Sequence, residues 1–439
     1  MLFEEEPKKK EIKLSAIIIA AVIVFVVILV IMAIVILGGS NKEPNQPIVN
    51  NNTIQNNNVE NTDIPVQITS EISEFPIDFL KLENQKQNMI YSPLSIKYAL
   101  NMLNEGASGN TKKQIDNVIG EMQLTKYSNK DNILSLANTI YIRDDYKQYM
   151  KESYQNTLVQ KYNAEVNYDT FENAQNVNQW IENKTMGIIK NMLQDNQMRM
   201  NRILLINALA IDMEWQTAFT PEKTHGEEFN LEDGSKMVAT MMQRESKAED
   251  VSYYKDTNMT AISMDLKQYD DTQLEFIAIM PNENLSDYIK DIKMNDINQV
   301  IKKLKPASQA NVGIEIKIPK FSFDYSLKLK QDLMSLGITD AFNSSLANFS
   351  NMADTDFHVS DALHKADIDF SEEGVKAAAV TVFAIKDNAM IREEEPEEIK
   401  FGRPFIYMIR DKKTDEIWFI GTVYQPNSWE KDKVDYQAR

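Results

Sequence analysis

The sequence predicts an α+β fold, with one large domain attached to a transmembrane helix near the N-terminus. Three observations lead to this prediction. Segments whose apolar residues have helical spacing come early in the domain, and long strand-like runs come later. A separate run of 24 residues, from Leu14 to Leu37, carries no charge. The first two observations predict a domain built on large sheets, and the third predicts a membrane anchor.

The run from Leu14 to Leu37 has the length of a membrane-spanning helix, since about 20 apolar residues cross the ~30 Å hydrocarbon core of a bilayer. Four lysines precede it: Lys8, Lys9, Lys10 and Lys13. Only Lys42 follows closely, so the positive-inside rule places residues 1–13 in the cytoplasm. We therefore expect a single-pass protein of the cell membrane with an extracellular domain. A cleaved secretory signal and a buried core helix are the alternatives.

The segment after this run, residues 38–68, is rich in Asn, Gln and Pro and poor in large apolar side chains. Such a composition cannot bury enough surface to offset the entropy lost on ordering, so we expect a disordered linker. Hydrophobic patterning then continues to Pro426 without an internal repeat or a second linker. We assign residues 69–426 to one domain and residues 427–439 to a flexible C-terminal tail.

Two segments of the domain have helical signatures. In residues 92–107, Ser92 is a typical N-cap, Pro93 takes the first helical position and Gly106 ends the apolar spacing. Residues 172–193 have apolar residues at helical spacing as well. We expect a helix in each segment.

Five later runs are strand-like: residues 202–215, 274–281, 311–326, 405–410 and 416–424. The stretch "VGIEIKIPKFSF", within 311–326, alternates apolar and polar residues, as a half-buried strand does. Helices followed by long strands of this kind are typical of an α+β domain.

Composition and motif content argue against several classes of function. The chain has 65 acidic and 47 basic residues, a formal net charge of −18, which disfavours binding to nucleic acid. It has no cysteine, and therefore no disulfide, thiol nucleophile or cysteine–zinc site. Its three histidines, His225, His358 and His364, lie in no HExxH motif, and GxSxG, P-loop and GxGxxG motifs are missing. We expect no enzymatic activity, cofactor, metal or small-molecule substrate.

Six stretches in order resemble the serpin family, from about residue 70 to Pro426. They are "NMIYSPLSIKYALNMLNEGASGNTKKQI", "INALAIDMEWQTAFTPEKT", "IPKFSF" with "LMSLGITDAF", "HKADIDFSEEGVKAAAVT", "FGRPFIYMI" and "WFIGTVYQP". Each motif alone is weakly specific. Six of them in family order make the resemblance specific, and it covers essentially the whole predicted extracellular domain.

The resemblance implies a metastable serpin-like fold with a large central mixed β-sheet, further sheets, about eight or nine helices and an exposed reactive loop. In this family a protease cleaves the loop, and the upstream half then inserts into the central sheet and carries the acylated protease with it. We therefore expect a monomeric suicide inhibitor that forms a covalent complex with a serine or cysteine protease. A non-inhibitory serpin, acting as a surface binding or chaperone-like module, is the alternative.

The resemblance also implies a mobile hinge upstream of the reactive bond. Its residues are Glu372, Glu373, Gly374, Val375, Lys376, Ala377, Ala378, Ala379, Val380 and Thr381. We expect Gly374 to occupy a turn that changes backbone conformation, because glycine has no Cβ. Val375 stands where the family usually has threonine; it is uncharged, so insertion should be retained.

The residues after Gly374 are patterned for insertion into a sheet. From Val375 to Ile385 the odd-numbered residues are uncharged, whereas Lys376 and Lys386 have the opposite parity. Alternate residues of a strand face opposite sides, so one face of this segment could enter a buried sheet. An ordinary Ala-rich connector is the alternative, and it does not explain the parity.

The family's usual spacing from Gly374 places the reactive bond between Asn388 and Ala389. Asparagine at this position would suit an asparagine-accepting, legumain-like cysteine protease or a tolerant subtilisin-like enzyme. A shifted register would present Met390, Arg392 or a residue near Lys386 instead, and Arg392 would attract a trypsin-like protease. These alternatives remain open.

The segment after the reactive bond, "REEEPEEIK" at residues 392–400, carries five glutamates around Pro396. One interpretation is a solvated loop that charge repulsion keeps extended. The other is an acidic exosite that accelerates encounter with a basic protease.

Two polar clusters complete the predicted site, both implied by the resemblance. A shutter beneath the central sheet comprises Ser92, Ser95, Asn207 and His364. A breach at the point of insertion comprises Trp215, Lys320 and Glu372. We expect the shutter residues to be buried and hydrogen bonded, and Lys320 to form an ion pair with Glu372.

Overall fold

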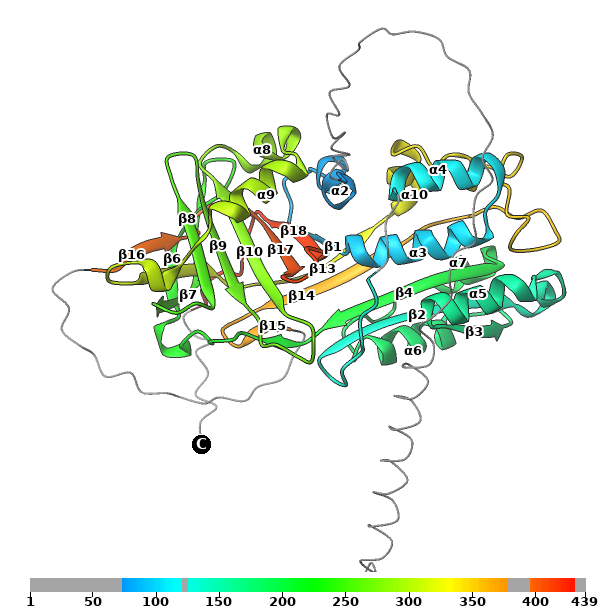
Figure 1. Ribbon diagram of the computed structural model, residues 1–439, viewed down its shortest axis with the longest axis horizontal. Helices are drawn as coiled ribbons and strands as arrows, with labels where there is room; N and C mark the ends of the chain where they lie inside the picture. The colour runs from blue at the N-terminus through cyan, green and yellow to red at the C-terminus, as the bar shows by residue number, and fades with distance from the viewer. Residues whose placement is uncertain (1–72, 121–124, 377–394, 431–439) are drawn as a thin grey trace, which may run out of the picture. The chain divides into compact units, whose positions relative to one another are not determined.

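The computed structural model describes residues 73–120, 125–376 and 395–430 (Figure 1). All three stretches belong to one compact unit, Ser70–Arg439. The predicted cytoplasmic segment, membrane span and linker lie outside the described residues. Within the three stretches, no helix is both long enough and apolar enough to cross a membrane.

The described residues contain nine α-helices, which fits the expected eight or nine, and four short 3-10 turns. The helices are α2 (Phe75–Leu82), α3 (Pro93–Gly106), α4 (Gly109–Ile119), α5 (Glu152–Tyr162), α6 (Gln175–Lys184), α7 (Asp195–Met200), α8 (Leu285–Asp291), α9 (Met294–Lys303) and α10 (Leu329–Ser335).

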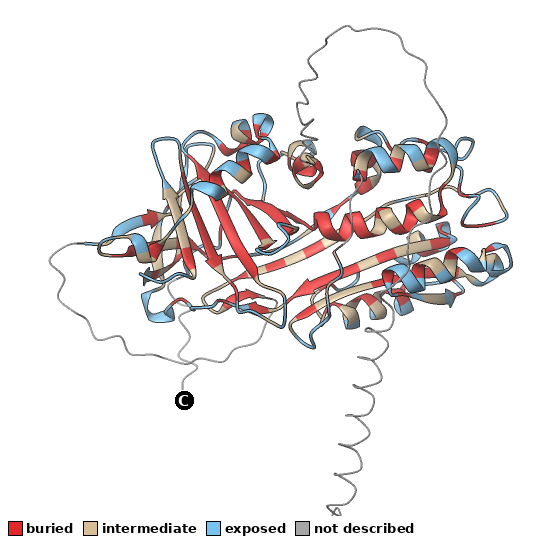
Figure 2. Ribbon diagram, in the orientation of Figure 1, coloured by how far each residue is buried: buried red, intermediate tan, exposed pale blue. Residues whose placement is uncertain are grey.

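The helix α3 begins and ends as its sequence predicts. The Ser92 hydroxyl accepts a hydrogen bond from the Ser95 N–H at 3.0 Å, and Pro93 follows the cap. Gly106 ends the helix against Met352, whose Cε would lie 2.7 Å from a Cβ at this position. Figure 2 shows α3 buried along much of its length, so it is a central element of the domain.

The second predicted helix is shorter than its apolar spacing suggested. Helix α6 covers Gln175–Lys184 rather than residues 172–193. Met186 and Gly187 have φ angles of 56° and 79°, and such left-handed residues end a helix. The chain from Ile188 to Gln194 is therefore irregular instead of continuing α6.

The largest sheet has seven antiparallel strands in the order β1-β18-β17-β10-β9-β8-β11. The strands are β1 (Met89–Tyr91), β18 (Ile417–Val423), β17 (Phe405–Asp411), β10 (Leu274–Pro281), β9 (Met259–Asp265), β8 (Val251–Lys255) and β11 (Lys305–Pro306). Every residue of β10 and β18 is buried, which explains their continuous apolar sequences. The predicted strands at 274–281, 405–410 and 416–424 are thus present.

A second sheet has the order β16-β12-β7-β6, and its β12–β16 pair is parallel. Its strands are β16 (Glu397–Lys400), β12 (Ile314–Pro319), β7 (Lys236–Ser246) and β6 (His225–Asn230). The part of β7 that β12 does not reach is covered by the chain end: the Trp429 N–H donates to the Val238 carbonyl at 2.9 Å, and Ser428 pairs with Ala239. The C-terminal tail therefore begins later than residue 427, because residues 427–429 are held by β7.

The predicted central sheet is present as two separate parts. One part has the order β13-β14-β15-β5, and the other has the order β3-β2-β4 with a parallel β2–β3 pair. The strands are β13 (Phe321–Leu327), β14 (His364–Phe370), β15 (Gly374–Lys376), β5 (Met213–Glu214), β3 (Ala164–Asp169), β2 (Leu134–Arg143) and β4 (Ile203–Ile211). β4 and β5 are nearly continuous in the chain, so the two parts meet at one end.

The strand-like run at 311–326 is in fact two strands in different sheets. β12 ends at Pro319 and β13 begins at Phe321. The intervening Lys320 donates its N–H to the Thr240 carbonyl at 2.9 Å, which ties this corner to β7. Alternation alone did not reveal the break, because both strands keep the same period.

The strand β4 separates two hydrophobic clusters. Its odd-numbered residues Ile203, Leu209 and Ile211 belong to the main core, which includes α3, and Ile206 belongs to a smaller cluster with Val177 of α6. One face of this part of the sheet thus looks toward α3 and the other toward α6.

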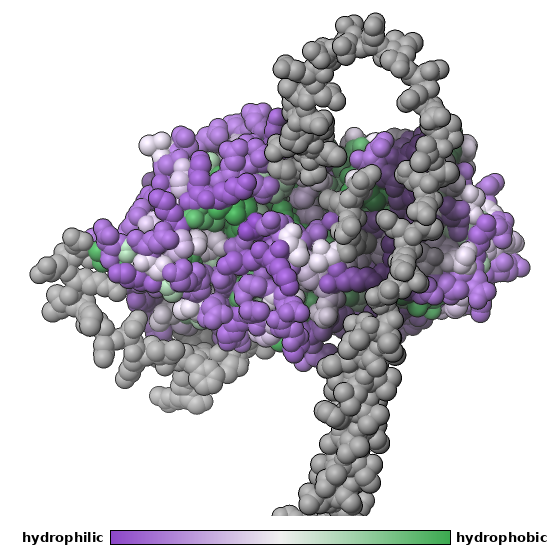
Figure 3. All heavy atoms as spheres, in the orientation of Figure 1, coloured by the Kyte–Doolittle hydropathy of each residue, from purple (hydrophilic) through white to green (hydrophobic). Residues whose placement is uncertain are grey.

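Hydrophilic residues cover most of the face of the molecule shown in Figure 3.

We predict that Gly421→Ala destabilises the domain, because its Cβ would collide with the Met89 carbonyl oxygen of β1 and lie 2.8 Å from the Tyr407 hydroxyl. Overpacking at a backbone contact between strands should lower the free energy of unfolding by about 1–3 kcal/mol. Thermal unfolding would measure this loss. In the matched control Gly402→Ala, the nearest atom is the flexible Lys400 Cε at 3.1 Å, so little change is expected. Equal melting temperatures for the two variants would contradict this account.

Candidate functional site

The central feature of the domain is a gap in the divided sheet between β4 and β14. β14 pairs with β13 along its whole length, but it pairs with β15 only through Asp369 and Phe370. β4 pairs with β2 on one side, and no described strand lies on its other side. At one end, β15 pairs with both β14 and β5. The gap at that end is therefore one strand wide.

Three cavities follow one another along this gap. The first lies next to β15 between Leu209–Ile211 and Ile368, with a volume of about 20 Å³. The second contains the predicted shutter residues and has a volume of about 60 Å³. The third lies between Ile203–Ile206 and residues 357–363, with a volume of about 140 Å³. The space between the two parts of the sheet thus widens with distance from β15.

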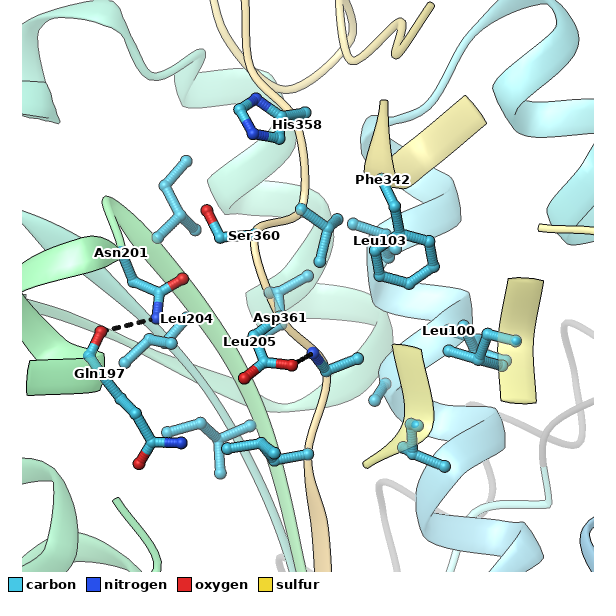
Figure 4. Close-up of a pocket in the computed structure, with 18 of the residues that line it drawn as sticks. Leu100, Leu103, Gln197, Asn201, Leu204, Leu205, Phe342, His358, Ser360 and Asp361 are labelled. Atoms are coloured by element: carbon cyan, nitrogen blue, oxygen red, sulfur yellow. Dashed lines mark hydrogen bonds between the residues drawn. The ribbon is translucent and has the colours of Figure 1, made fainter. Parts of the chain in front are cut away.

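The third cavity has mostly apolar walls (Figure 4). β4 and α3 contribute four of its leucines: Leu204, Leu205, Leu100 and Leu103. Polar groups at the wall bind their own neighbours: the Asn201 amide donates to the Gln197 carbonyl at 2.8 Å, and the Ala362 N–H donates to the Asp361 carboxylate at 2.9 Å. The cavity therefore suits apolar side chains rather than a polar ligand.

The predicted breach residues meet at the joined end of the gap. Lys320 Nζ lies 2.7 Å from Glu372 Oε2, so the expected ion pair is present. The Trp215 indole N–H donates to the Ser371 carbonyl at 2.9 Å, and its ring lies edge-on to Phe370 at 5.2 Å. Trp215 is only 1% exposed. The three residues therefore enclose the point where β15 enters the sheet.

Residues 215–224, which we call the mouth segment, hold the chain just before the hinge glycine. The N–H groups of Trp215 and Phe219 donate to the carbonyls of Glu373 and Glu372, both at 2.9 Å. The Thr224 hydroxyl donates to the Glu372 carboxylate at 2.8 Å. Sequence analysis missed these contacts, because backbone bonds between distant residues leave no mark in residue types.

The start of the predicted hinge is already part of the sheet. Gly374–Lys376 form β15, in which Val375 pairs with Phe370 of β14 and with Met213 of β5. Val375 is 3% exposed. The first residues of the predicted insertable segment therefore occupy the position of an inserted strand.

The structure gives a further reason for glycine at position 374. In this conformation Gly374 does not have a left-handed backbone. A Cβ there would instead collide with the Met213 carbonyl oxygen and approach the Glu214 Cα to 2.8 Å. Glycine is required because the hinge passes very close to β5.

The remaining hinge residues, Ala377, Ala378, Ala379, Val380 and Thr381, lie outside the described residues. The same holds for the predicted reactive bond Asn388–Ala389 and for the alternatives Met390 and Arg392. Their positions remain sequence predictions.

The four predicted shutter residues line the second cavity but form two groups. The Ser92 N–H donates to His364 Nε2 at 3.0 Å, and the Ser95 N–H donates to the Ser92 hydroxyl. Asn207 lies across the gap and donates its amide to Asn138 Oδ1 at 2.8 Å. The hydrogen bonds of these four residues therefore stay on their own side of the gap.

Asn138 is a site residue that sequence analysis missed. It lies opposite Asn207 in the β2–β4 pair and donates its own amide to the Tyr162 carbonyl at 2.8 Å. Asn207 Oδ1 is buried and has no hydrogen-bond partner among the described protein atoms. An asparagine in the apolar stretch "LANTIYI" is the signal that could have identified Asn138.

Burial makes His364 a neutral acceptor. It lowers the pKa of His364 to about 4, so the ring is uncharged at neutral pH. Nε2 accepts the Ser92 N–H, which places the ring proton on Nδ1. The shutter on this side of the gap thus depends on an unprotonated imidazole.

The other two histidines are not near the shutter hydrogen bonds. His225 contacts the Lys223 carbonyl at 2.9 Å and Glu227 at 3.2 Å, and His358 lies beside the third cavity. Among the described residues, no three His, Asp or Glu side chains are placed to hold a metal ion. The histidines therefore serve three separate local environments.

The described part of the acidic segment is bonded to the second sheet. Glu398 forms an ion pair with Lys317 at 2.7 Å, and its carbonyl accepts from Lys255 Nζ at 2.8 Å. The hydrogen bond between the Lys317 side chain and the Glu398 carboxylate raises the pKa of Lys317. Part of the negative charge that an exosite would use is thus neutralised by the protein itself.

Comparison with known proteins identifies relatives of the whole domain. A family model described as "Serpin (serine protease inhibitor)" matches residues 71–426. A serpin-like protein of Methanosarcina acetivorans is 29% identical over 82% of this chain and 86% of its own, and the leukocyte elastase inhibitor of Xenopus tropicalis is 26% identical over 82% and 99%. The crystal structure of the thermophilic serpin tengpin in the native state has a TM-score of 0.67 and 28% identity, covering 80% of this chain and 92% of tengpin.

We predict that His364→Ala increases heat-induced polymerisation or conversion to a latent form. The variant removes the acceptor for the Ser92 N–H and enlarges the second cavity, so the gap should open more easily. Native gel electrophoresis after mild heating measures the rate. His225→Ala, at a half-exposed site, is the control and should behave as wild type. An unchanged rate for His364→Ala would show that the shutter assignment is wrong.

The free energy of unfolding should also decrease as the pH is lowered from about 6.5 to 4. The pKa of His364 is about 4 in the fold against 6.5 in the unfolded chain, so the unfolded chain binds more protons in this window. The loss should be on the order of 3 kcal/mol and should not extend above pH 6.5. His364→Gln keeps an acceptor without titrating, so chemical unfolding at several pH values should show a shallower slope for it. Equal slopes for wild type and His364→Gln would show that His364 does not cause the pH dependence.

Proposed function

The chain belongs to the serpin family, and on this premise we propose that it is an extracellular, membrane-tethered suicide inhibitor of a serine or cysteine protease. Cleavage of the reactive loop would release its upstream half, which then fills the gap between β4 and β14. The single observation that carries this proposal is that gap, which is one strand wide and already holds Gly374–Lys376 at its closed end.

The register of β15 predicts where each later residue would lie. Val375 pairs with Met213 and Phe370, and each further residue moves one step back along both antiparallel neighbours. Six steps on, Thr381 would lie between Asn207 and His364. Ten steps on, Ile385 would lie beside Ile203, which is the first residue of β4. The pairing position therefore ends at the residue where the uncharged parity of the loop also ends.

The same register explains the parity of the loop sequence. Residues directly opposite in antiparallel strands place their side chains on the same face. The odd-numbered loop residues would then share a face with Leu209 of β4 and with Ala366 and Ile368 of β14, which are buried in the main core. Lys376 and Lys386 would lie on the other face.

Side-chain size also follows the shape of the gap. In this register Ala377 and Ala379 would enter the narrow first cavity, and Thr381 the second. Phe383 and Ile385 would enter the third and widest cavity, which has apolar walls. The loop thus places its small residues where space is scarce and its large ones where space is available.

One polar side chain of the loop could bind a polar atom in the gap that lacks a hydrogen-bond partner. Thr381 carries the only hydroxyl among the odd-numbered residues from 375 to 385. Its level is that of Asn207, whose buried Oδ1 has no partner among the described protein atoms. Insertion would supply a donor there and remove the cost of an unpaired buried acceptor, about 1–3 kcal/mol.

The reactive bond would lie beyond the last inserted residue. Asn388–Ala389 follows Ile385 closely, as do Met390 and Arg392. Asn388 would select an asparagine-accepting cysteine protease or a tolerant subtilisin-like enzyme, and Arg392 a trypsin-like one. Mass spectrometry of the loop after cleavage would identify the bond.

The tether belongs to the proposal as well. The uncharged run from Leu14 to Leu37 and the lysines before it support a single-pass anchor with the serpin domain outside the cell. Recovery of the full chain in the soluble fraction after alkaline extraction of membranes would refute the anchor.

Incubation with a panel of proteases tests the inhibitory function. An inhibitor forms a complex with the protease that survives SDS. The inhibitor itself also gains heat resistance once its loop is cleaved. Cleavage without such a complex would indicate a non-inhibitory serpin, and turnover of a peptide by the protein itself would indicate an enzyme.

We predict that a charge on the inward parity abolishes inhibition. Ala379→Lys would bury a cation between Leu209 and Ala366, so the loop should be cleaved without forming a stable complex. Ala378→Lys is the matched control, because the lysine introduced at position 378 would lie beside Asp367 on the opposite face of the sheet. The complex-forming fraction on SDS gels measures both. Equal behaviour of the two variants would contradict the proposed register.

A further inference from the structure

The mouth segment is anchored by a buried arginine that lies outside every site described so far. Arg244 of β7 has a side chain that is 4% exposed. Its Nη1 donates to the Thr217 carbonyl, and its guanidinium carbon lies 5.0 Å from the centre of the Phe219 ring. Both contacts are to residues of the mouth segment, and Phe219 also donates its N–H to the Glu372 carbonyl. Arg244 is thus connected to the hinge through one intervening residue.

The charge of Arg244 is poorly compensated. The nearest carboxylate, Asp250, lies 3.9 Å from Nη1, which is too far for a hydrogen bond. Arg244 Nε and both Asp250 carboxylate oxygens are buried and have no hydrogen-bond partner among the described protein atoms. Burial lowers the pKa of Arg244 to about 10, and the guanidinium remains protonated at neutral pH. A cation is therefore kept in the interior although its partner does not bind it well.

Such a pair does not favour stability. Replacing a buried ion pair by well-packed apolar residues is often neutral or stabilising, because the charges lose their hydration. This pair also lacks the hydrogen bonds that would offset the loss. A reason other than stability is therefore needed, and the contacts with Thr217 and Phe219 supply one.

We propose that Arg244 is a positioning residue for loop insertion, which fixes the mouth segment and thereby the register in which the hinge enters the sheet. The proposal rests on the proposed inhibitory function. The Thr217 carbonyl and the Phe219 ring hold the mouth segment to Arg244, and the mouth segment holds the backbone of Glu372 and Glu373. The pairing of β15 with β5 begins at the next residue, Gly374. A loose mouth segment would delay insertion, and the protease would then be released before it is trapped.

Two variants separate positioning from charge balance. Arg244→Met removes the bonds to the mouth segment and leaves Asp250 as an unpaired buried charge. Combining it with Asp250→Asn removes that charge without restoring the bonds. If Arg244 positions the hinge, the double variant should recover the melting temperature lost in Arg244→Met. Its ratio of cleaved, released inhibitor to trapped complex should still be about fivefold higher than that of wild type, the factor expected from one net hydrogen bond, so that more inhibitor is consumed per protease blocked.

Either of two results would overturn the proposal. The first is recovery of both melting temperature and stoichiometry in the double variant, which would show that Arg244 only balances Asp250. The second is an Arg244→Met variant with wild-type stoichiometry. A matched control is available in Arg410 and Glu275, a buried pair in the seven-stranded sheet whose Nε–Oε1 distance is 2.9 Å. Arg410→Met with Glu275→Gln should not change the stoichiometry.

A second readout is independent of inhibition. Hydrogen exchange at the Trp215 and Phe219 amides reports the bonds to Glu373 and Glu372 directly. In the double variant these amides should exchange about fivefold faster, while amides of β17 stay unchanged. If wild type traps no protease, the proposed function fails, and exchange still decides whether Arg244 holds the mouth segment. Unchanged exchange at both amides would overturn the inference even where inhibition is intact.

Discussion

A strand position that no described residue fills, inside a β-sheet, is the constraint on which the rest of this structure depends. Strands β4 and β14 each have one edge without a strand partner over most of their length among the described residues. Backbone groups that are buried without partners are costly, so the arrangement can persist only if surrounding elements keep the two parts in place. α3 lies against the side of the gap where Ser92 and Ser95 meet His364, and the β5–β15 pair closes one end. The fold is thus organised around a place where a strand is missing.

The polar groups along the gap are distributed so that the two parts can move apart. Ser92 and Ser95 bind on the side of His364, whereas Asn207 binds Asn138 within the other part of the sheet. None of these hydrogen bonds crosses the gap, so widening it would break none of them. At the closed end, Trp215, Phe219 and Thr224 of the mouth segment hold Glu372 and Glu373. Hydrogen bonds thus hold the closed end together, whereas the shutter bonds would not resist widening of the rest of the gap.

Sequence analysis could predict what depends on residue type and spacing. The cap of α3 and the apolar strands of the seven-stranded sheet follow from such patterns. The pairing of Lys320 with Glu372 was instead implied by the resemblance to the serpin family. Sequence analysis could not predict the division of the central sheet, because strand partners are chosen by the folded chain as a whole. The collision that makes Gly374 necessary, the bonds of Asn138 and the contacts of Arg244 were missed for the same reason: each depends on a neighbour far away in sequence. The reactive bond is predicted to lie within residues 377–394, which are known from sequence alone.

The pairing of Gly374–Lys376 changes the kinetic problem that insertion poses. Starting a new strand is slow in general, because chain entropy is lost before enough contacts form to offset it. Here the first residues are already ordered between β5 and β14, so a cleaved loop would begin from an existing nucleus. Only elongation would remain, and even the formation of a whole β-hairpin takes only about 1–10 μs. In an inhibitor of this kind, insertion of the loop competes with hydrolysis of the acyl bond to the protease. A nucleus that forms before the protease arrives would shorten the time that insertion needs.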